Sequence, residues 1–284
     1  MSDNAKRLSP RQRALRVRVV QYAIFVAVVA LVLFTANWPQ FGRVFLRGDI
    51  IQETVTRMIA LAPGSATHVP ALLLALLNTL AYSLGAFILG LLLGTALALM
   101  KLSSVGPYRW VAMIYTEIFR GLPALVVLLA FNMLPLAFPG LRLPLDPYGA
   151  VWIALGIVYA AYMSETIRAG IQAVPVGQVE AARTLGMTSG LATRRIVLPQ
   201  AFRIITPPLT NDLIALVKDS SLVYILGLST QGFELTKYGR DITNNTANLS
   251  PLVVAGLCYL VITVPLGLLV RHMEAKAKAS GGTK

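Results

Sequence analysis

The sequence predicts an all-α integral membrane protein with about six transmembrane helices and with both termini in the cytoplasm. Hydrophobic residues make up 56% of the chain, charged residues only 13%, and the mean hydropathy is +0.69. A helix that crosses a bilayer needs about 20 predominantly apolar residues. Six segments meet this requirement or come close to it, at about residues 19–37, 72–100, 110–138, 148–167, 205–228 and 251–270.

The first apolar segment follows a basic head that contains Lys6, Arg7, Arg11, Arg13, Arg16 and Arg18. A signal peptide can begin this way, but this run is long and no convincing small-residue cleavage site follows it. We therefore interpret it as an uncleaved anchor. The long outer loop at about residues 38–71 is predicted to hold a short interfacial helix that ends before Pro63 and Gly64. His68 in this loop is expected to be solvated.

Two features of the second and third segments predict how their helices pack and bend. Ala86, Gly90 and Gly94 recur at four-residue spacing, which lets another helix backbone approach closely. We expect a general packing face here rather than a specific homodimer contact. In the third segment, Pro123 removes a backbone donor and is expected to kink the helix.

Ionisable residues inside apolar segments are costly, so each needs a partner, an aqueous cavity or a boundary position. Glu117 and Arg120 are three residues apart, as are Glu165 and Arg168, so each pair can share one face of its helix. Both pairs fall near the expected cytoplasmic ends of their segments. The simplest interpretation is an interfacial salt bridge or anchor.

The fifth segment carries a stripe of polar residues at or toward mid-membrane depth. Its members are Asn211, Asp212, Lys218, Asp219, Ser220 and Ser221. Asn211 and Lys218 are seven residues apart, as are Asp212 and Asp219, so they form two adjacent columns on the helix. Two compatible interpretations stay open: a buried structural ion-pair network, and the lining of a path for charged or zwitterionic solutes.

The distribution of lysine and arginine predicts the orientation in the membrane. With the N-terminus inside, 17 of the 25 basic residues fall in segments expected to be cytoplasmic, and six fall outside. The remaining two, Arg120 and Lys218, lie within segments. This asymmetry explains the net charge of +13 without nucleic acid, for which the sequence offers no basic face with interleaved aromatic residues.

Motifs of enzymatic chemistry are missing from the sequence. It contains no GxxxxGK[ST] phosphate loop, no HExxH and no GxSxG elbow, and two histidines with one cysteine cannot supply an ordinary zinc site. Cys258 lies in an apolar run and is expected to be a small core residue. If the protein moves a solute against a gradient, an ion or a separate ATPase must supply the energy.

Between the fourth and fifth segments, on the predicted cytoplasmic side, runs the charged stretch VEAARTLGMTSGLATRRIVLPQAF. Glu180 lies in the first turn of a predicted helix that Gly186 ends, and a second short helix follows a Gly-Met-Thr-Ser-Gly turn. Ala181, Ala182 and Leu185 are predicted to form a small face that docks into a groove of another protein. A helix that lies on lipid is the alternative.

The spacing E-A-A-x3-G-x9-I-x-L-P, from Glu180 to Pro199, resembles the signature loop of the membrane subunits of ATP-binding-cassette importers. Other stretches resemble the permeases for polar amino acids such as histidine, glutamate, glutamine, arginine, cystine or opines. These stretches are Asn78-Thr79, Arg120-Gly121-Leu122-Pro123, Ala161-Tyr162 with Glu165 and Arg168, Gly170-Ile171-Gln172, Pro175, Gly177-Gln178, Pro199-Gln200-Ala201, Pro207-Pro208 and Lys218 to Val223.

The resemblance implies three regions in the chain. A five-helix type I importer core would occupy residues 72–272, preceded at 1–71 by the basic tail, the extra helix and the outer loop, and followed by a cytoplasmic tail at 273–284. The loop at about residues 177–200 would form coupling helices that sit in a cleft of a cytoplasmic ATPase. Its implied coupling residues are Glu180, Ala181, Ala182, Arg183, Leu185, Gly186, Ile196, Leu198 and Pro199. For the two charged pairs, contact with the ATPase or the coupling loop is the functional alternative.

The resemblance also implies a set of partners in a bacterial plasma membrane. They are two copies of the ATPase, a second permease chain that is the same or similar, an extracytoplasmic solute-binding protein, and lipid. The chain itself would bind no cofactor, and ATP with Mg would bind to the partner ATPase. An ion-coupled secondary transporter and a membrane sensor or assembly protein remain as alternative functions.

Overall fold

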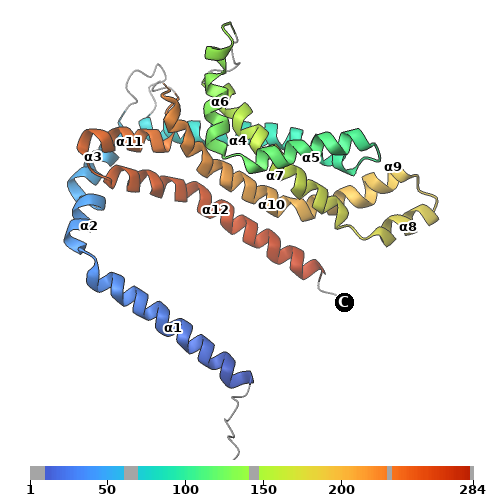
Figure 1. Cartoon of the computed structure of the whole chain (residues 1–284), viewed down its shortest axis with the longest axis horizontal. Coiled ribbons are helices and arrows are strands. Elements are labelled where there is room, and N and C mark those ends of the chain that lie inside the picture. Colours follow the sequence, from blue (N-terminus) through green and yellow to red (C-terminus); the bar gives the residue numbers. More distant parts are fainter. Residues whose placement is uncertain (1–9, 61–69, 141–146, 229–231, 282–284) are drawn as a thin grey trace, which may run out of the picture. The chain divides into compact units, whose positions relative to one another are not determined.

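The computed structural model describes residues 10–60, 70–140, 147–228 and 232–281, and these residues form helices and connecting segments (Figure 1). The basic residues Lys6 and Arg7, the loop residues Pro63, Gly64 and His68, and Arg142 lie outside the described residues. The chain divides into two compact units, Met1–Arg47 and Gly48–Lys284.

The N-terminal unit contains α1 (Pro10–Thr35) and α2 (Trp38–Phe45). The stretch Leu15–Thr35 is apolar and long enough to cross a membrane, and none of its most apolar window is buried within the protein. A helix that is apolar all round needs lipid or other protein around it. This helix therefore agrees with the predicted first span.

The second unit holds the remaining helices. They are α3 (Gly48–Ile59), α4 (Ala71–Leu102), α5 (Gly106–Gly121), α6 (Ala124–Ala137), α7 (Gly149–Gln172), α8 (Val176–Thr184), α9 (Ser189–Ala192), a π-helical turn (Thr193–Val197), α10 (Leu198–Asp219), a 3-10 helix (Ser220–Leu226), α11 (Leu235–Thr246) and α12 (Ser250–Gly281). The most extensive contact joins α4 to α7, and α10 packs against α4, α7 and α12.

The predicted packing face on α4 is confirmed, and it explains why α4 and α7 lie so close together. Ala86 is buried, and side chains built on the two glycines would press on the α7 backbone. A Cβ at Gly90 would lie 3.2 Å from the Gly156 carbonyl oxygen, and one at Gly94 would lie 3.0 Å from that of Ala160. Only small residues allow this approach.

Pro123 breaks the predicted third span rather than bending it slightly. α5 ends at Gly121, α6 begins at Ala124, and the two helix axes differ by 102°. Leu122 is extended at ψ 136°, the conformation that a following proline enforces, and the proline ring offers no backbone donor. Figure 1 shows α6 turned away from α5 at this point.

Among the described residues, four helices are apolar and long enough to span a membrane, or five if α5 and α6 count as one broken span. Of the six predicted spans, the fifth is not among them. α10 has 22 residues, about 33 Å at 1.5 Å per residue, yet it carries several charged and polar side chains. It also ends at Asp219, where a 3-10 helix takes over. A six-span count and the orientation of the termini therefore stay predictions.

The predicted helix in the outer loop corresponds to α3, but it is more than an interfacial element. Ile50, Thr54 and Met58 form a buried face, and α3 packs against α4, α11 and α12. The Tyr238 hydroxyl of α11 donates to the Arg57 carbonyl at 2.9 Å, and the Ala71 amide donates to the Ala60 carbonyl at 2.9 Å. α3 is therefore part of the second unit's helix bundle.

Candidate functional site

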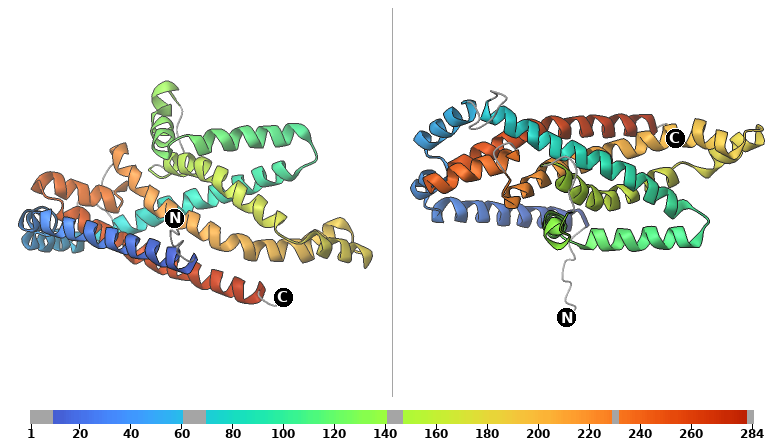
Figure 2. Two further views of the ribbon diagram at one scale, coloured as in Figure 1. Left: turned by 60° about the horizontal axis from the view of Figure 1, so that its bottom comes forward. Right: turned by 90° about the horizontal axis from the view of Figure 1, so that it is seen from above.

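The charged stretch forms a hairpin of short helices that projects beyond the ends of α7 and α10, as all the views in Figures 1 and 2 show. α8 starts after Pro175, the N-cap residue, which is extended at ψ 127° and whose carbonyl accepts from the Gln178 amide at 3.1 Å. It ends in a Schellman motif: the Gly186 amide donates to the Arg183 carbonyl and the Met187 amide to the Ala182 carbonyl. Gly186 adopts φ +84°, so this position favours glycine, as the sequence predicts.

The predicted second short helix, α9, is the first part of a continuous helical segment that runs on into α10. The Thr188 hydroxyl oxygen caps α9 by accepting from the Leu191 amide, and α9 continues through the π-helical turn into α10. Pro199 has no N–H for the carbonyl four residues earlier, which disfavours a regular α-helical turn here. The missing donor is accommodated by a wider π-helical turn, in which the Leu198 amide donates a hydrogen bond to the Thr193 carbonyl.

The base of the hairpin is tied to the bundle by contacts that sequence reasoning missed. Val174, Val197 and Ala201 form a small buried cluster between the ends of α7, the π-helical turn and α10. The Gln200 side-chain amide donates to the Gln178 side-chain oxygen at 2.5 Å, joining α10 to α8. Val197 and Ala201 are four residues apart and share one helix face, which was the local signal for part of this cluster.

The tip residues divide into a buried and an exposed group. Ala182 is buried, so the predicted face of Ala181, Ala182 and Leu185 is wrong in one member. The reason is that Ala182 points back toward α9 and the π-helical turn, which pack against α8. Leu185 is 82% exposed. The other exposed residues of the predicted coupling set are Glu180, Ala181, Arg183, Gly186, Leu198 and Pro199, and Ile196 is partly exposed.

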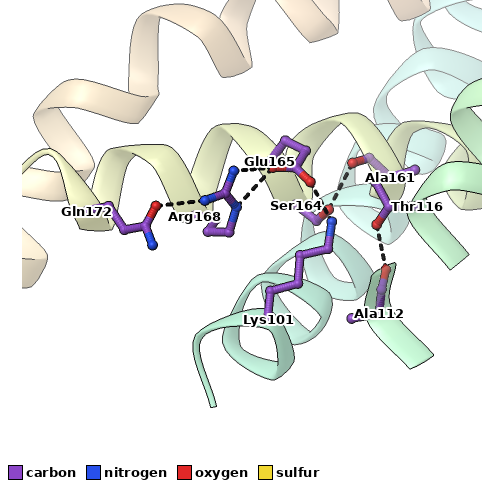
Figure 3. A network of polar contacts seen from close by, with 8 residues as sticks. All are labelled: Lys101, Ala112, Thr116, Ala161, Ser164, Glu165, Arg168 and Gln172. Carbon is purple, nitrogen blue, oxygen red and sulfur yellow. Dashed lines mark hydrogen bonds and ion pairs between the residues drawn. The ribbon is translucent and has the colours of Figure 1, made fainter. Parts of the chain in front are cut away.

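Glu165 of α7 is the centre of a polar network that connects two helix ends (Figure 3). Its Oε1 pairs with Lys101 Nζ of α4 at 2.6 Å, and its Oε2 pairs with Arg168 Nη2 at 2.7 Å. Arg168 also donates to the Gln172 side-chain oxygen at 2.7 Å, three residues before Pro175. The predicted Glu165–Arg168 pair therefore forms, and Lys101 is a member that spacing along one helix could not reveal.

The predicted Glu117–Arg120 pair does not form. Within the described residues no ion pair joins them, because the Arg120 guanidinium lies over the Tyr162 ring of α7, 5.7 Å from its centroid. The Tyr162 hydroxyl also contacts the Arg120 carbonyl at 3.5 Å. A cation–π contact across helices has replaced the ion pair expected within one helix.

The two columns of the α10 stripe have different surroundings. Asp212 and Asp219 are partly buried, and the Tyr159 hydroxyl of α7 donates to Asp219 Oδ2 at 2.8 Å. Asp212 Oδ2 is buried without a hydrogen-bond partner. Asn211 and Lys218 are exposed.

The predicted structural ion-pair network is therefore wrong, since no ion pair among the described residues involves this stripe. The two serines of the stripe also make no hydrogen bond to a charged side chain in the part of the chain that the structure describes. Ser220 is buried and donates to the Val217 carbonyl at 2.8 Å, and Ser221 is partly buried. What remains of the prediction is a polar face on α10 whose charged side chains form no ion pair within the described part of the chain.

At the other end of the bundle, a buried carboxylate caps α11, and the sequence reasoning did not single it out. Glu234 is fully buried and accepts from the Thr236 and Lys237 amides, each at 2.6 Å, and from the Tyr259 hydroxyl at 2.7 Å. Burial raises the pKa of Glu234 to about 7, against the lowering effect of these three donors. Glutamate is an unusual helix cap, so no local signal marked it.

The family model for the inner membrane component of binding-protein-dependent transport systems matches residues 86–279, more than half of the chain. The chain belongs to this family. The match runs from the middle of α4 through the hairpin into α12, and it includes the hairpin and the α7 and α10 helices that hold its base.

Curated relatives of this inner membrane component have amino-acid transport names. The arginine transport system permease protein ArtQ of Bacillus subtilis is 38% identical over 214 residues, which are 75% of this chain and 95% of the relative. The glutamate/aspartate import permease protein GltK of Escherichia coli is 38% identical over 213 residues, 73% of this chain and 93% of the relative.

Solved structures agree with this membership. A crystal structure of an amino acid ABC transporter with histidines matches with a TM-score of 0.64 and 37% identity, over 73% of this chain and 94% of that chain. A bacterial ABC transporter involved in alginate import matches over 96% of this chain and 99% of that chain, with a TM-score of 0.60 and 16% identity, which supports the fold alone. The inner membrane component is thus an all-helical, multi-pass ABC importer subunit.

Proposed function

We propose that this chain is the permease subunit of an ATP-driven importer that moves a polar amino acid or a close derivative into the cytoplasm. The observation that carries the proposal is the hairpin: a rigidly based pair of short helices that projects beyond the bundle with Glu180, Arg183 and Leu185 exposed at its tip. The names of the relatives support the substrate class, because arginine and glutamate/aspartate permeases match over most of their lengths.

In this proposal, the hairpin sits in a cleft of a separate ATPase, which binds ATP with Mg. The complex contains two copies of the ATPase, two permease chains, which are the same or similar, and an extracytoplasmic solute-binding protein. Both termini of the chain lie in the cytoplasm, as the excess of basic residues there favours. Closure of the ATPase draws the two hairpins together and changes the populations of inward-facing and outward-facing states.

The hairpin can transmit such a movement because its base is attached at several points. The buried cluster of Val174, Val197 and Ala201 joins it to α7 and α10. Glu165 then connects α7 to α4 through Lys101. A displacement of the tip is therefore applied to the packed α4, α7 and α10 helices as a unit rather than absorbed in a flexible loop.

The polar face of α10 is proposed to line the path of the solute. Lys218 and Asn211 are exposed and Asp219 is partly exposed on a helix that continues directly from the hairpin. Charges inside a membrane persist only next to protein, water or a charged ligand. A zwitterionic amino acid offers groups of both signs to such a face. An ion-coupled secondary transporter is the less favoured alternative, because the relatives are ABC importer permeases.

Glu180→Arg is the variant that tests coupling. Reversing an exposed charge at the tip of the hairpin is expected to abolish ATP-driven uptake in proteoliposomes and the stimulation of ATPase by the loaded binding protein, with normal insertion of the chain. Glu274→Arg, an equal charge reversal on the exposed end of α12, is the matched control and should keep both activities. Uptake at the wild-type rate in Glu180→Arg would reject the assignment of the hairpin.

A further inference from the structure

The N-terminal unit ends in a short helix with two chemically different faces. On α2, Trp38, Phe41 and Phe45 lie three, four and seven residues apart and therefore share one side of the helix. Phe41 and Phe45 stack with ring centroids 4.7 Å apart, and Trp38 meets Phe41 edge-on at 5.8 Å. Gln40 and Arg43 lie on the opposite side. α2 buries none of its residues in the unit.

The position of α2 next to α1 is determined by covalent and hydrogen-bonded connections. Only Ala36 and Asn37 separate the two helices. The Trp38 indole N–H donates to the Leu33 carbonyl at 2.8 Å, which satisfies a carbonyl in the last turn of α1. The Asn37 side-chain oxygen caps α2 by accepting from the Gln40 amide at 3.1 Å. α2 is therefore held at the C-terminal end of the apolar helix.

We propose that α2 is an interfacial membrane anchor, whose aromatic face is embedded in the lipid at the end of the α1 span. α1 is an apolar helix of spanning length, so its last turn lies at a membrane surface, and so must a helix attached two residues later. Tryptophan and phenylalanine belong at this depth, with the polar side toward water.

Lipid explains this face better than a second protein. Trp38 of the aromatic face is hydrogen-bonded to the last turn of the apolar helix α1, and Arg43, on the opposite side, is exposed, as is Arg47 at the end of the unit. Basic side chains at a membrane surface meet lipid phosphates and water rather than hydrocarbon. The anchor would set the depth and the rotation of α1 in the bilayer, a role that lies outside the region of the family match, which begins at residue 86.

Spin labels on the two faces test the anchor. The chain's single cysteine, Cys258, is replaced by alanine, and Phe41→Cys or Arg43→Cys is labelled with a nitroxide in the complete transporter in lipid nanodiscs. Accessibility to oxygen, which concentrates in lipid, and to a water-soluble nickel chelate then gives the depth of each label. The Phe41 label should lie about 5–10 Å below the lipid phosphates, and the Arg43 label should lie in water.

Two control positions calibrate the result: Phe25→Cys in the middle of α1, expected at hydrocarbon depth, and Glu274→Cys, expected in water. High nickel accessibility at both Phe41 and Arg43 would place both faces of α2 in water and overturn the proposal. Exclusion of both oxygen and nickel from the Phe41 label would mean that another protein covers the aromatic face, and this too would overturn it. Depths that match at Phe41 in the free chain and in the complete transporter support the anchor.

Discussion

Glu165 shows how one residue can hold the ends of two helices together. Lys101 is only 6% exposed, so its ammonium group depends on the carboxylate that α7 presents to it. The second oxygen of Glu165 accepts two hydrogen bonds from the Arg168 guanidinium, so both carboxylate oxygens are engaged. Removal of the carboxylate leaves a largely buried cation, and such a loss is more costly than a lost surface pair.

We expect Glu165→Ala to lower the free energy of unfolding by about 1–3 kcal/mol because the buried Lys101 donor loses its partner. Glu117→Ala is the matched control, since Glu117 makes no ion pair within the described residues, and it should leave stability nearly unchanged. Thermal unfolding in detergent measures both. Adding Lys101→Met to Glu165→Ala should recover part of the loss, and no recovery would argue that the cation is not the cause.

Glu234 gives a second prediction, on pH. Its pKa is raised by burial to about 7 from an ordinary value near 4.5, so the folded chain holds this proton more tightly than the unfolded chain. The contribution of Glu234 to stability is then fully present below pH 4.5 and falls as pH rises toward 7, by at most about 1.4 kcal/mol per pH unit. Glu234→Gln should flatten this part of the profile of unfolding midpoint against pH. Parallel profiles for the two proteins would contradict the assignment.

At the scale of elements, the hairpin depends on how its first helix ends. The Schellman motif at Gly186 reverses the chain toward α9, and a left-handed residue is needed for it. Open space surrounds this glycine, so a substituted side chain would meet no steric obstacle from its neighbours. Backbone conformation alone decides what is tolerated there.

Gly186→Val should therefore strain the turn by about 1–2 kcal/mol and misdirect α8, while Gly186→Asn, a residue that tolerates this conformation, should not. In the assembled importer we expect the valine variant to lose coupled uptake and the asparagine variant to keep most of it. The ratio of solute transported to ATP hydrolysed is the informative measurement. Equal ratios in the two variants would show that the geometry of the turn does not matter for coupling.

For the molecule as a whole, the energy for transport must come from outside the chain. The sequence holds no phosphate loop, and the family is one of membrane components that act with other subunits. In the proposed function, the exposed tip of the hairpin receives the ATPase. Transport is thus expected to be a property of the assembly.

The purified chain should hydrolyse no ATP and should not concentrate a labelled polar amino acid in proteoliposomes. Adding the ATPase, the binding protein and any second permease chain, with ATP and Mg on the ATPase side, should restore uptake. Arginine and glutamate are the first solutes to test, because they are carried by named relatives. Uptake driven by a sodium or proton gradient without the ATPase would instead support a secondary transporter.

The sequence alone determined the features that depend on local pattern. Apolar length marks α1, α4, α7 and α12, the spacing from Glu180 to Pro199 marks the hairpin, and Gly186 marks its turn. These signals are readable because helix formation, membrane partition and turn chemistry act over a few neighbouring residues.

Only the tertiary structure decided which side chains meet across helices. It paired Glu165 with Lys101, turned Arg120 from Glu117 to Tyr162, buried Ala182 in the hairpin, and separated the faces of the α10 stripe. The contacts of Glu165, Arg120 and Asp219 are with residues of other helices, dozens of residues away in the sequence. Ala182 is buried by the neighbouring part of the hairpin. Helical periodicity gives the face of a residue on its own helix, whereas the rotation and approach of the facing helix follow from packing of the whole bundle.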